Sequence, residues 1–488
     1  MANYFPVIGL EIHCQLATKT KMFCGCEIEV NTTPNKHVCP VCLGMPGAMP
    51  VPNKKAVEYA IRLGLALNCE IDLNAMWTRK NYFYPDLPKG YQITQTGGLP
   101  VYDHPICKNG WIEVTRADGV TKRIGITRIH MEEDAGKLIH DMSPTDSHFD
   151  ANRCGTPLCE IVTEPDIRSP EEAVLALKKI KQILEYTQVS NANMENGNMR
   201  CDGNISLRPS EDAPFGIRAE IKNLNSFTNL EKALYAEISL QSLTLDAGKE
   251  VEQCTKRYNP DTDKTIVIRS KEDAHDYKYF PEPDMVRLVT DPAFVEEIRR
   301  TLPELPDARR ARFMSEYGVT EYDARVLTDD RDVSIWFDTA AKKVVDSAKN
   351  GKILANWVIS ELLREVKDLE GGLAAVKIKP EQLAVLVNKI TDNTISGKIA
   401  KTVFAEMFQT GDDPEKIIKD KGLVQITDTS AIEAVVREVV AENAAQFAEF
   451  KAGKVALKGF FVGMSMRKSG GKANPGLVNQ ILDKLAAE

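Results

Sequence analysis

The amino-acid sequence predicts an α+β fold, in which an N-terminal part built on an antiparallel β-sheet is followed by helical parts. Up to about residue 290, short alternating segments recur between Gly, Pro and Asn residues, a pattern typical of strands joined by turns. From about residue 293 onward, the chain is rich in Ala, Glu, Lys and Leu at helical spacing. The Pro-rich run Tyr279–Asp284 separates the two regions. We therefore expect a domain boundary near residue 292.

A second boundary is predicted at Gly411, where Gly and Pro residues interrupt the helical pattern. The last helix is expected to begin at Asn474 as its cap, with Pro475 in its first turn. A chain of 488 residues fits about three domains at roughly 100–200 residues each. The expected domains are 1–292, 293–410 and a small helical tail, 411–488.

One helix in the N-terminal region carries clear start signals. Ser169 is expected as the N-cap, Pro170 suits the first position, and Glu172 completes a Ser-x-x-Glu capping box. Apolar residues recur on one face of this helix, namely Val174, Leu177, Ile180 and Leu184. A second helix is expected over about 228–246.

The composition excludes several classes of protein. Lys and Arg number 62 against 70 Asp and Glu, so no general basic surface attracts nucleic acid, and any RNA contact needs local patches. The 11 Cys residues are an odd number, and the N-terminus lacks a signal peptide, which favours reduced thiols in the cytoplasm. No run of about 18 apolar residues occurs, so we expect no membrane span.

The strongest functional signal is a set of strands whose polar faces combine carboxylates, His and Arg. In the segment 7–16 the even positions are apolar, while Glu11, His13 and Gln15 share the opposite face, because strand side chains alternate. The same period aligns three further groups, which are Arg128, His130 and Glu132; Arg200, Asp202, Asn204, Ser206 and Arg208; and Arg218, Glu220 and Lys222.

Each pattern alone also fits the solvated outer face of an antiparallel sheet. Four together favour chemistry, because carboxylates ligate Mg²⁺ while Arg and Lys neutralise phosphate oxygens. Glu132, Glu133 and Asp134 are consecutive acidic residues. Because strand side chains alternate, Glu132 and Asp134 lie on one face and Glu133 on the other. We expect Glu132 to reach the metal. Glu160 and Glu164 are further carboxylates, although a role in a loop or at a helix start explains Glu164 equally well.

Two close pairs of cysteines predict a second metal site. Cys24 and Cys26 are followed by Cys39 and Cys42, and four thiolates at this spacing can hold one tetrahedral Zn²⁺. Such a set leaves no open position for water, so the metal would be structural. Buried free cysteines or two disulfides are the alternatives, and His37 is close enough in sequence to compete as a ligand.

The segment 79–92 interleaves basic and aromatic residues. Such a loop can stack on a nucleotide or a terminal RNA base while Lys and Arg meet phosphate, and core packing of its Tyr and Phe residues is the alternative. The chain lacks Gly-x-x-x-x-Gly-Lys-Ser/Thr, which excludes a P-loop kinase. It also lacks the commonest zinc-protease and serine-hydrolase motifs and any Gly- and Ser-rich run of amidase type.

Together these residues resemble the family of B subunits of bacterial glutamyl/aspartyl-tRNA amidotransferases over essentially the whole chain. The matching strings are Gly9–His13, Arg79–Asp86, His130–Lys137, Arg200–Ser206, Lys222–Ser226, Tyr279–Asp284 and Ala473–Pro475. The resemblance implies a cradle-shaped N-terminal catalytic domain, a helical domain and a YqeY-like tail that contacts tRNA. It also implies a cytoplasmic heterotrimer with an amidase A subunit, which releases ammonia from glutamine, and a small C subunit.

The resemblance implies roles for individual residues. The Mg²⁺ ligands would be Glu11, His13, Glu132 and Glu160, with Glu220 as an additional candidate. The catalytic residues would be Glu11, His13, Glu132, Arg200 and Asp202. The ATP-binding cations would be Lys80, Arg128, Arg218 and Lys222. The four cysteines fit a zinc-containing branch, because some members of the family lack them.

The implied reaction is ATP-dependent phosphorylation of the side-chain carboxylate of misacylated Glu-tRNA(Gln) or Asp-tRNA(Asn). Ammonia then displaces phosphate and leaves Gln-tRNA or Asn-tRNA. Because an acyl phosphate hydrolyses in water, an enclosed passage for ammonia is expected. A zinc-stabilised RNA-binding protein and an Mg²⁺-dependent phosphohydrolase or nuclease are the alternative functions.

A basic cluster in the tail predicts contact with the body of the tRNA. Its members are Lys454, Lys458, Arg467, Lys468 and Lys472, and the sequence suggests no set of carboxylates beside them. Such a patch would position the RNA without performing chemistry. A solvated helix surface is the alternative, since basic residues are common near helix ends.

Overall fold

The computed structural model describes residues 4–29, 32–97, 99–140, 145–270, 276–423, 428–470 and 472–487. Two compact units divide the chain, Met1–Leu305 and Pro306–Glu488. The strands of the first unit are β1 (Phe5–Gln15), β2 (Glu70–Ile71), β3 (Asn74–Ala75), β4 (Thr78–Asn81), β5 (Tyr91–Thr94), β6 (Cys107–Thr115), β7 (Thr121–Glu133), β8 (Lys137–Ile139), β9 (His148–Asp150), β10 (Pro157–Thr163), β11 (Met199–Arg208), β12 (Ala219–Lys222), β13 (Cys254–Asn259), β14 (Lys264–Ser270), β15 (Phe280–Pro281) and β16 (Leu288–Val289). Its helices are α1 (Lys54–Ala66), η1 (Pro100–Tyr102), α2 (Pro170–Thr187), α3 (Phe227–Asp246) and α4 (Pro292–Arg300).

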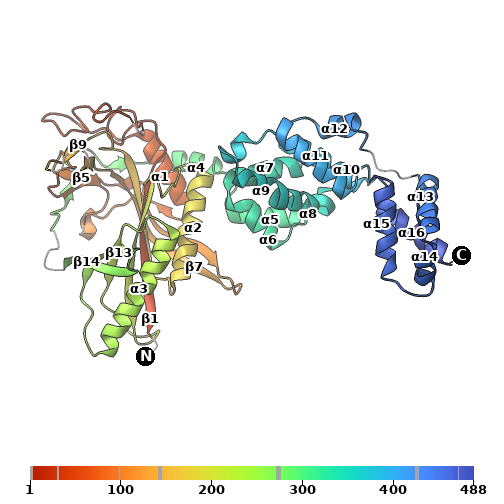
Figure 1. Cartoon of the computed structure of the whole chain (residues 1–488). Helices are drawn as coiled ribbons and strands as arrows, with labels where there is room; N and C mark the ends of the chain where they lie inside the picture. Colours follow the sequence, from red (N-terminus) through yellow and green to blue (C-terminus); the bar gives the residue numbers. More distant parts are fainter. Residues whose placement is uncertain are drawn as a thin grey trace. The chain divides into compact units, whose positions relative to one another are not determined.

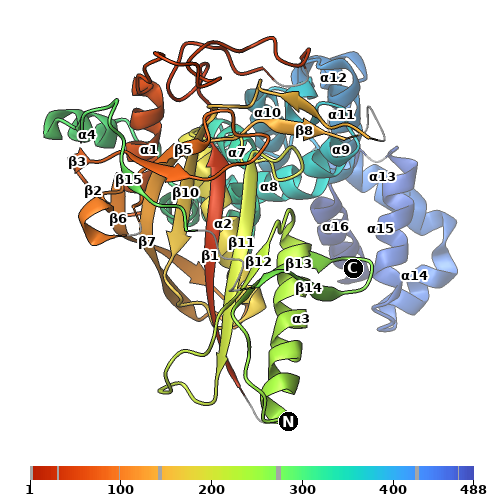
Figure 2. The same cartoon turned by 90° about the vertical axis from the view of Figure 1, so that its left-hand side faces the viewer.

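The first unit is built on one large sheet. Its strand order is β14-β13-β12-β11-β1-β10-β7-β6-β2, with β1 near the centre (Figure 2). Neighbouring strands are antiparallel except for β12 and β13, which run parallel. The predicted combination of an antiparallel sheet with helices is confirmed.

The two faces of this sheet have opposite character. Helices α1, α2 and α3 lie along one face (Figure 1) and pack on strands that include β6 and β11. The alternation predicted for the first strand is confirmed, because Ile8, Leu10 and Ile12 are buried in the core under these helices. The other face therefore carries the polar side chains of the same strands.

Both predicted helices of the first unit are present, but one predicted capping interaction at the start of α2 differs. Helix α2 begins after Ser169, whose side chain accepts a hydrogen bond from the backbone N–H of Glu172. The Glu172 carboxylate accepts from the backbone N–H of Arg168 at 2.9 Å and from Lys122, so the reciprocal half of the predicted capping box is wrong. Helix α3 matches the predicted helix at 228–246.

A small sheet, β15-β4-β5, packs against β7 on the polar side. Arg79 on β4 donates to Glu282 at 2.7 and 2.9 Å and to Asp284 at 2.8 Å, and its guanidinium lies over the ring of Tyr91. Arg79 therefore joins two parts of the unit, and phosphate contact by the basic residues of this segment stays a prediction. Core packing is also wrong for two aromatic residues of the segment, Phe83 and Tyr84, because both are exposed.

The second unit is helical. Its elements are α5 (Pro306–Tyr317), α6 (Glu321–Asp329), α7 (Arg331–Ala341), α8 (Ser347–Trp357), η2 (Val358–Leu362), α9 (Leu363–Lys367), η3 (Gly372–Ala375), α10 (Pro380–Thr391), α11 (Gly397–Thr410), α12 (Pro414–Asp420), α13 (Thr429–Glu442), α14 (Ala444–Lys451), α15 (Leu457–Lys468) and α16 (Pro475–Ala487). One apolar core runs from Phe313 to Ile418, and another from Ile432 to Leu485. The three-domain limits at 292 and 410 stay a prediction. Among the described helices, none has the length and apolar character that crossing a membrane requires.

The end of the chain confirms one expectation and corrects another. The Asn474 side chain accepts from the backbone N–H groups of Gly476 and Leu477, so the predicted cap of the last helix is confirmed. The premise that the basic cluster of the tail lacks neighbouring carboxylates is wrong. Ion pairs join Lys454 to Glu449 at 2.9 Å, Lys458 to Asp483 at 2.6 Å, and Lys468 to Glu438 at 2.8 Å.

Candidate active site

Strand register brings the predicted polar residues into rows across the sheet. His13 on β1 lies opposite Glu160 on β10, and Glu160 lies opposite His130 on β7. Glu11 lies opposite Asp202 on β11 in the next row. Residues directly opposite on antiparallel strands share a face, so these side chains meet on the face that the helices leave uncovered.

The first group is centred on Glu160. Its carboxylate lies 3.2 Å from Nε2 of His13 and 3.3 Å from Nε2 of His130. His130 Nε2 also lies 3.2 Å from Oε1 of Glu132. His13, Glu132 and Glu160 offer ligand atoms that all lie within 4.8 Å of one another. We refer to these three residues as the inner cluster.

The charges of the buried His and Glu residues in and beside the inner cluster shift one another's pKa values. Burial by itself would lower the pKa of His130, but the carboxylates of Glu160 and Glu132 raise it to about 9. Burial would raise the pKa of Glu160, but the charge of His130 and the hydrogen bond from His13 hold it well below its ordinary value. Both carboxylates are therefore anionic at neutral pH, and a cation can replace the imidazole protons as their counter-charge.

The second group lies beside the first on β1, β11 and β12. Glu11, Asp202 and Glu220 also bring their ligand atoms within 4.8 Å of one another, and we refer to them as the outer cluster. Lys222 Nζ lies 3.1 Å from Asp202 and 2.7 Å from Glu220. Burial, followed by the charges of Glu160 and Glu220, raises the pKa of Glu11. A cation added here would relieve this repulsion among carboxylates.

Most predicted site residues thus lie in one of two adjacent groups instead of in a single Mg²⁺ set. Arg200 lies opposite His13 in the strand register, but its guanidinium pairs with Asp134 at 2.7 Å. Arg218 is exposed and precedes β12. Glu164 is exposed and accepts from Thr127 at 2.8 Å, which fits the loop role considered for it.

The predicted cations differ in how closely they approach the clusters. The ammonium of Lys80 lies near Glu132 and Glu160, whose charges raise its pKa although burial opposes them. Arg128 shares the polar face, and its buried Nε has no hydrogen-bond partner in the described structure. Lys222 contacts the outer cluster directly.

Some of the unpaired buried polar atoms of the described chain lie beside the clusters. Among the described residues they include Nε of Arg128, Nδ1 of His130, Oε1 of Gln92 and Oδ1 of Asn204. Buried polar groups are nearly always paired, so several unpaired atoms around one site indicate a ligand that is absent from the protein chain.

Two side chains that hold Glu132 were not predicted as site residues. Thr94 Oγ1 donates to Glu132 Oε1 at 2.8 Å, and Gln92 Nε2 lies 3.2 Å from Glu132 Oε2. Both come from β5, a strand of four residues whose short alternation gave no functional signal. The spacing of His130 placed it on the polar face, but no separate role was predicted for it.

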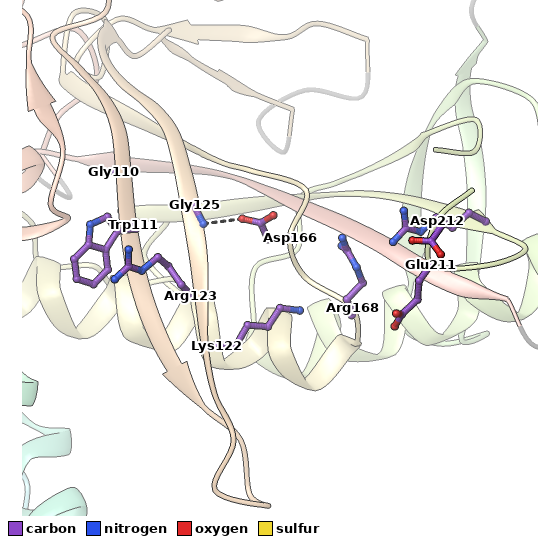
Figure 3. Close-up of a pocket in the computed structure, with 10 residues that line it drawn as sticks. Gly110, Trp111, Lys122, Arg123, Gly125, Asp166, Arg168, Glu211 and Asp212 are labelled. Carbon is purple, nitrogen blue, oxygen red and sulfur yellow. Dashed lines mark hydrogen bonds between the residues drawn. The ribbon is translucent and has the colours of Figure 1, made fainter. Parts of the chain in front are cut away.

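A cavity of about 280 Å³ adjoins the outer cluster. Glu11, Asn204 and Arg218 line it together with Phe215 and the backbone around Gly9. A larger and more open cavity, of about 660 Å³, is lined by residues that include Trp111, Arg123, Arg168 and Asp212 (Figure 3). The larger cavity contains none of the cluster residues, so the smaller one is the candidate ligand pocket.

The four predicted zinc ligands are brought together. The Sγ atoms of Cys24, Cys26, Cys39 and Cys42 lie within 4.8 Å of one another, and all four cysteines are free thiols, so the alternative of two disulfides is wrong. His37 lies outside the set, because its Nε2 is 3.0 Å from Glu29. Four converging thiols fit the donor set that Zn²⁺ prefers.

Comparisons with known proteins place the chain in a family. A sequence model of the GatB/GatE catalytic domain matches residues 6–296, and a second model, of the GatB domain, matches residues 338–485. The B subunit of the aspartyl/glutamyl-tRNA(Asn/Gln) amidotransferase of Carboxydothermus hydrogenoformans is 52% identical over 100% of both chains. Proteins of the same name from Geobacter sp. strain M21 and Brevibacillus brevis are 52% and 48% identical, each over 99% of both chains. The chain therefore belongs to the GatB/GatE family.

Proposed function

We propose that the chain uses ATP to activate the side-chain carboxylate of misacylated Glu-tRNA(Gln), Asp-tRNA(Asn) or both, for amidation by ammonia. The names of the relatives support tRNA-dependent amidotransfer. The main support for the phosphoryl-transfer step is the pair of adjacent carboxylate clusters on one sheet face, with cations and unpaired buried polar atoms around them.

The chemistry explains why ATP is needed. Ammonia cannot displace an oxide ion from a carboxylate. A carboxylate oxygen of the aminoacyl group therefore attacks the γ-phosphorus of ATP, the bond to the β-phosphate oxygen breaks, and ADP leaves. The nitrogen of ammonia then attacks the acyl carbon, phosphate leaves, and the nitrogen loses a proton.

The residues of the chain supply positioning and charge for this transfer. The inner and outer clusters would hold Mg²⁺, which neutralises phosphate oxygens when bound. Lys80 and Lys222 add positive charge near the two clusters, and the unpaired Nε of Arg128 can donate to a phosphate or carboxylate oxygen. Arg200 and Asp202 would act differently: Arg200 orients Asp134, whereas Asp202 belongs to the outer cluster.

The cavity beside Glu11 is the proposed place of the nucleoside. Its apolar and backbone walls suit a base, and Arg218 at its edge can meet phosphate. From this cavity the phosphates would extend over the outer cluster toward the inner one. The aminoacyl carboxylate would then lie near Glu132, where the β15-β4-β5 sheet limits access of water to an acyl phosphate.

Ammonia must come from a partner, so we propose a cytoplasmic complex with a glutamine-hydrolysing amidase subunit and a small third subunit. The zinc site would serve the fold of the first unit. Its four thiolates leave no ligand position open for a substrate.

The test is an assay of ATP consumption by the complex, co-expressed with its amidase and small subunits. We expect ADP release that depends on Glu-tRNA(Gln) or Asp-tRNA(Asn) and is absent with uncharged or correctly charged tRNA. Amidated tRNA should form with ammonium chloride even when the glutaminase is inactivated. ATP hydrolysis that ignores the aminoacyl group, or cleavage of phosphoesters without ATP, would instead support a phosphohydrolase or nuclease.

A further inference from the structure

Lys21 is a fully buried lysine beside the cysteine cluster. Its ammonium donates to the backbone carbonyl of His37 at 2.7 Å, to that of Ala151 at 3.2 Å, and to Sγ of Cys42 at 3.6 Å. These contacts occupy all three N–H donors of the ammonium. Two of them are neutral carbonyls, so the sulfur is the contact that can carry a compensating charge.

Another buried lysine of the same unit has a different environment. Lys256 is also buried, and its ammonium lies 2.8 and 2.9 Å from the two carboxylate oxygens of Glu237. Lys21, in contrast, forms no ion pair with a carboxylate in the described part of the chain. A buried ammonium without a counter-charge is costly, and Cys42 is the group in contact with Lys21 that can carry one, as a thiolate.

The charge of a zinc centre supplies this balance. Cysteines bind zinc as thiolates, so four of them around one Zn²⁺ carry a net charge of −2. This charge lies in a partly buried site, since Cys42 is buried and the other three are half-buried. An ammonium at hydrogen-bond distance from one thiolate reduces the net charge of the group and orients that sulfur.

We propose that Lys21 is a positioning residue of the zinc site, whose ammonium balances the four-thiolate centre through Cys42. The same side chain ties the cysteine loop, through His37, to Ala151 in the segment that leads into β10. Backbone hydrogen bonds from Met22 to Gly155 and from Gly155 to Asp134 continue this connection toward the polar face. The inference rests on the proposed zinc site.

The test measures zinc retention in the full-length chain, purified with its partner subunits. Zinc per chain is determined first, and its release to a chromophoric chelator is then followed over time. Lys21→Met keeps the length of the side chain and removes the charge, so zinc affinity should fall about 10- to 100-fold and release should accelerate accordingly. Lys21→Gln keeps amide donors without the charge, and it should release zinc nearly as fast.

Two controls separate the proposed role from general destabilisation. Lys19→Met removes an exposed charge close by in sequence and should leave release unchanged. Lys256→Met removes a buried ammonium that contacts Glu237 and none of the four proposed zinc ligands, so it should lower Tm without accelerating zinc release. In addition, the Tm difference between zinc-loaded and zinc-stripped protein should shrink in Lys21→Met and not in Lys256→Met.

The outcomes distinguish the inference from the zinc site on which it rests. Wild-type protein without zinc would overturn both. Zinc in the wild type with equal release from Lys21→Met and Lys19→Met would overturn the role of Lys21 alone. If Lys21→Met does not fold, slow release from folded Lys21→Gln would overturn it equally well.

Discussion

The two carboxylate clusters lie side by side on one sheet face, yet their surroundings differ. In the inner cluster, Glu132 is 2% exposed, is held by Thr94 and Gln92 and lies beside the fully buried His130. In the outer cluster, Glu11 and Glu220 are half-buried and a cavity adjoins Glu11. Protein contacts also hold the outer cluster, since Asn204 donates to Glu11, the backbone N–H of Asn223 to Asp202 and Thr255 to Glu220. The clusters therefore differ chiefly in that the candidate ligand pocket adjoins the outer one.

The contrast indicates which cluster is ready to hold a cation before substrate arrives. Ligands held by packing and hydrogen bonds bind a cation with little reorganisation, so we expect the inner cluster to retain Mg²⁺ without nucleotide. The outer cluster adjoins the candidate ligand pocket, so we expect it to gain its cation together with the phosphates of ATP.

The largest effect is expected from Glu160, which the imidazoles of both His13 and His130 contact. Glu160→Gln removes the central negative charge, so tRNA-dependent ATP consumption should fall by about 10²–10³-fold or more. Binding of the misacylated tRNA, measured by filter retention, should stay nearly unchanged. Glu164→Gln, a neighbouring exposed carboxylate outside both clusters, is the matched control. Loss of tRNA affinity with intact phosphoryl transfer would make the sheet face an RNA platform.

A smaller and different effect is expected from Glu220 in the outer cluster. Glu220→Gln should raise the apparent KM for Mg·ATP by about 10- to 100-fold, with a lesser change in kcat, because the weakened cation arrives with the nucleotide. Raising the Mg²⁺ concentration should restore part of the activity. An equal loss of kcat at saturating ATP and Mg²⁺ would remove the proposed distinction between the clusters.

A third carboxylate, Asp338 in the second unit, is satisfied by fixed partners and should matter for stability only. Burial alone would raise its pKa, but hydrogen bonds from Arg312, Tyr317 and Lys342 lower it from 3.8 to about 2. Because the folded pKa is depressed, the stabilisation is present above the unfolded value and is lost as pH falls toward 2. Asp338→Asn should cost about 2 kcal/mol at neutral pH, and the cost should vanish near pH 2.

Urea unfolding at several pH values measures this cost, with Asp332→Asn at an exposed position as control. ATP consumption by folded Asp338→Asn protein should equal that of the wild type. A pH-independent loss of stability would show that packing, and not charge, is what Asp338 contributes.

The smallest effect is expected from the tail. Truncation after Leu423 keeps α12, which packs in the apolar core that runs from Phe313 to Ile418. It removes the last apolar core, which runs from Ile432 to Leu485. Because Lys454, Lys458 and Lys468 are paired with carboxylates, we expect only about a threefold rise in KM for tRNA and a slightly flatter salt dependence. If the salt dependence of KM for tRNA is unchanged, the tail makes no phosphate contact. A hundredfold rise in KM for tRNA would show that the basic cluster of the tail is a main tRNA-binding surface.

The sequence predicted the local features well, because their signals are local. Alternation placed Glu11 and His13 opposite the buried residues of β1, and cap chemistry located the starts of α2 and α16. The spacing of four cysteines also predicted their convergence. In each case the determining contacts lie within a few residues or follow from a fixed side-chain period.

Short segments of the chain therefore indicate which residues face away from the core, whereas strand pairing across the whole unit sets which of them meet. A period of two assigns a face but not a neighbouring strand, so it could not place Glu160 between His13 and His130 or divide the carboxylates into two clusters. Likewise, the pairing of Arg79 with Glu282 joins residues about two hundred positions apart. Such contacts depend on strand order and register, which arise from packing of the whole unit and leave no mark in any short segment.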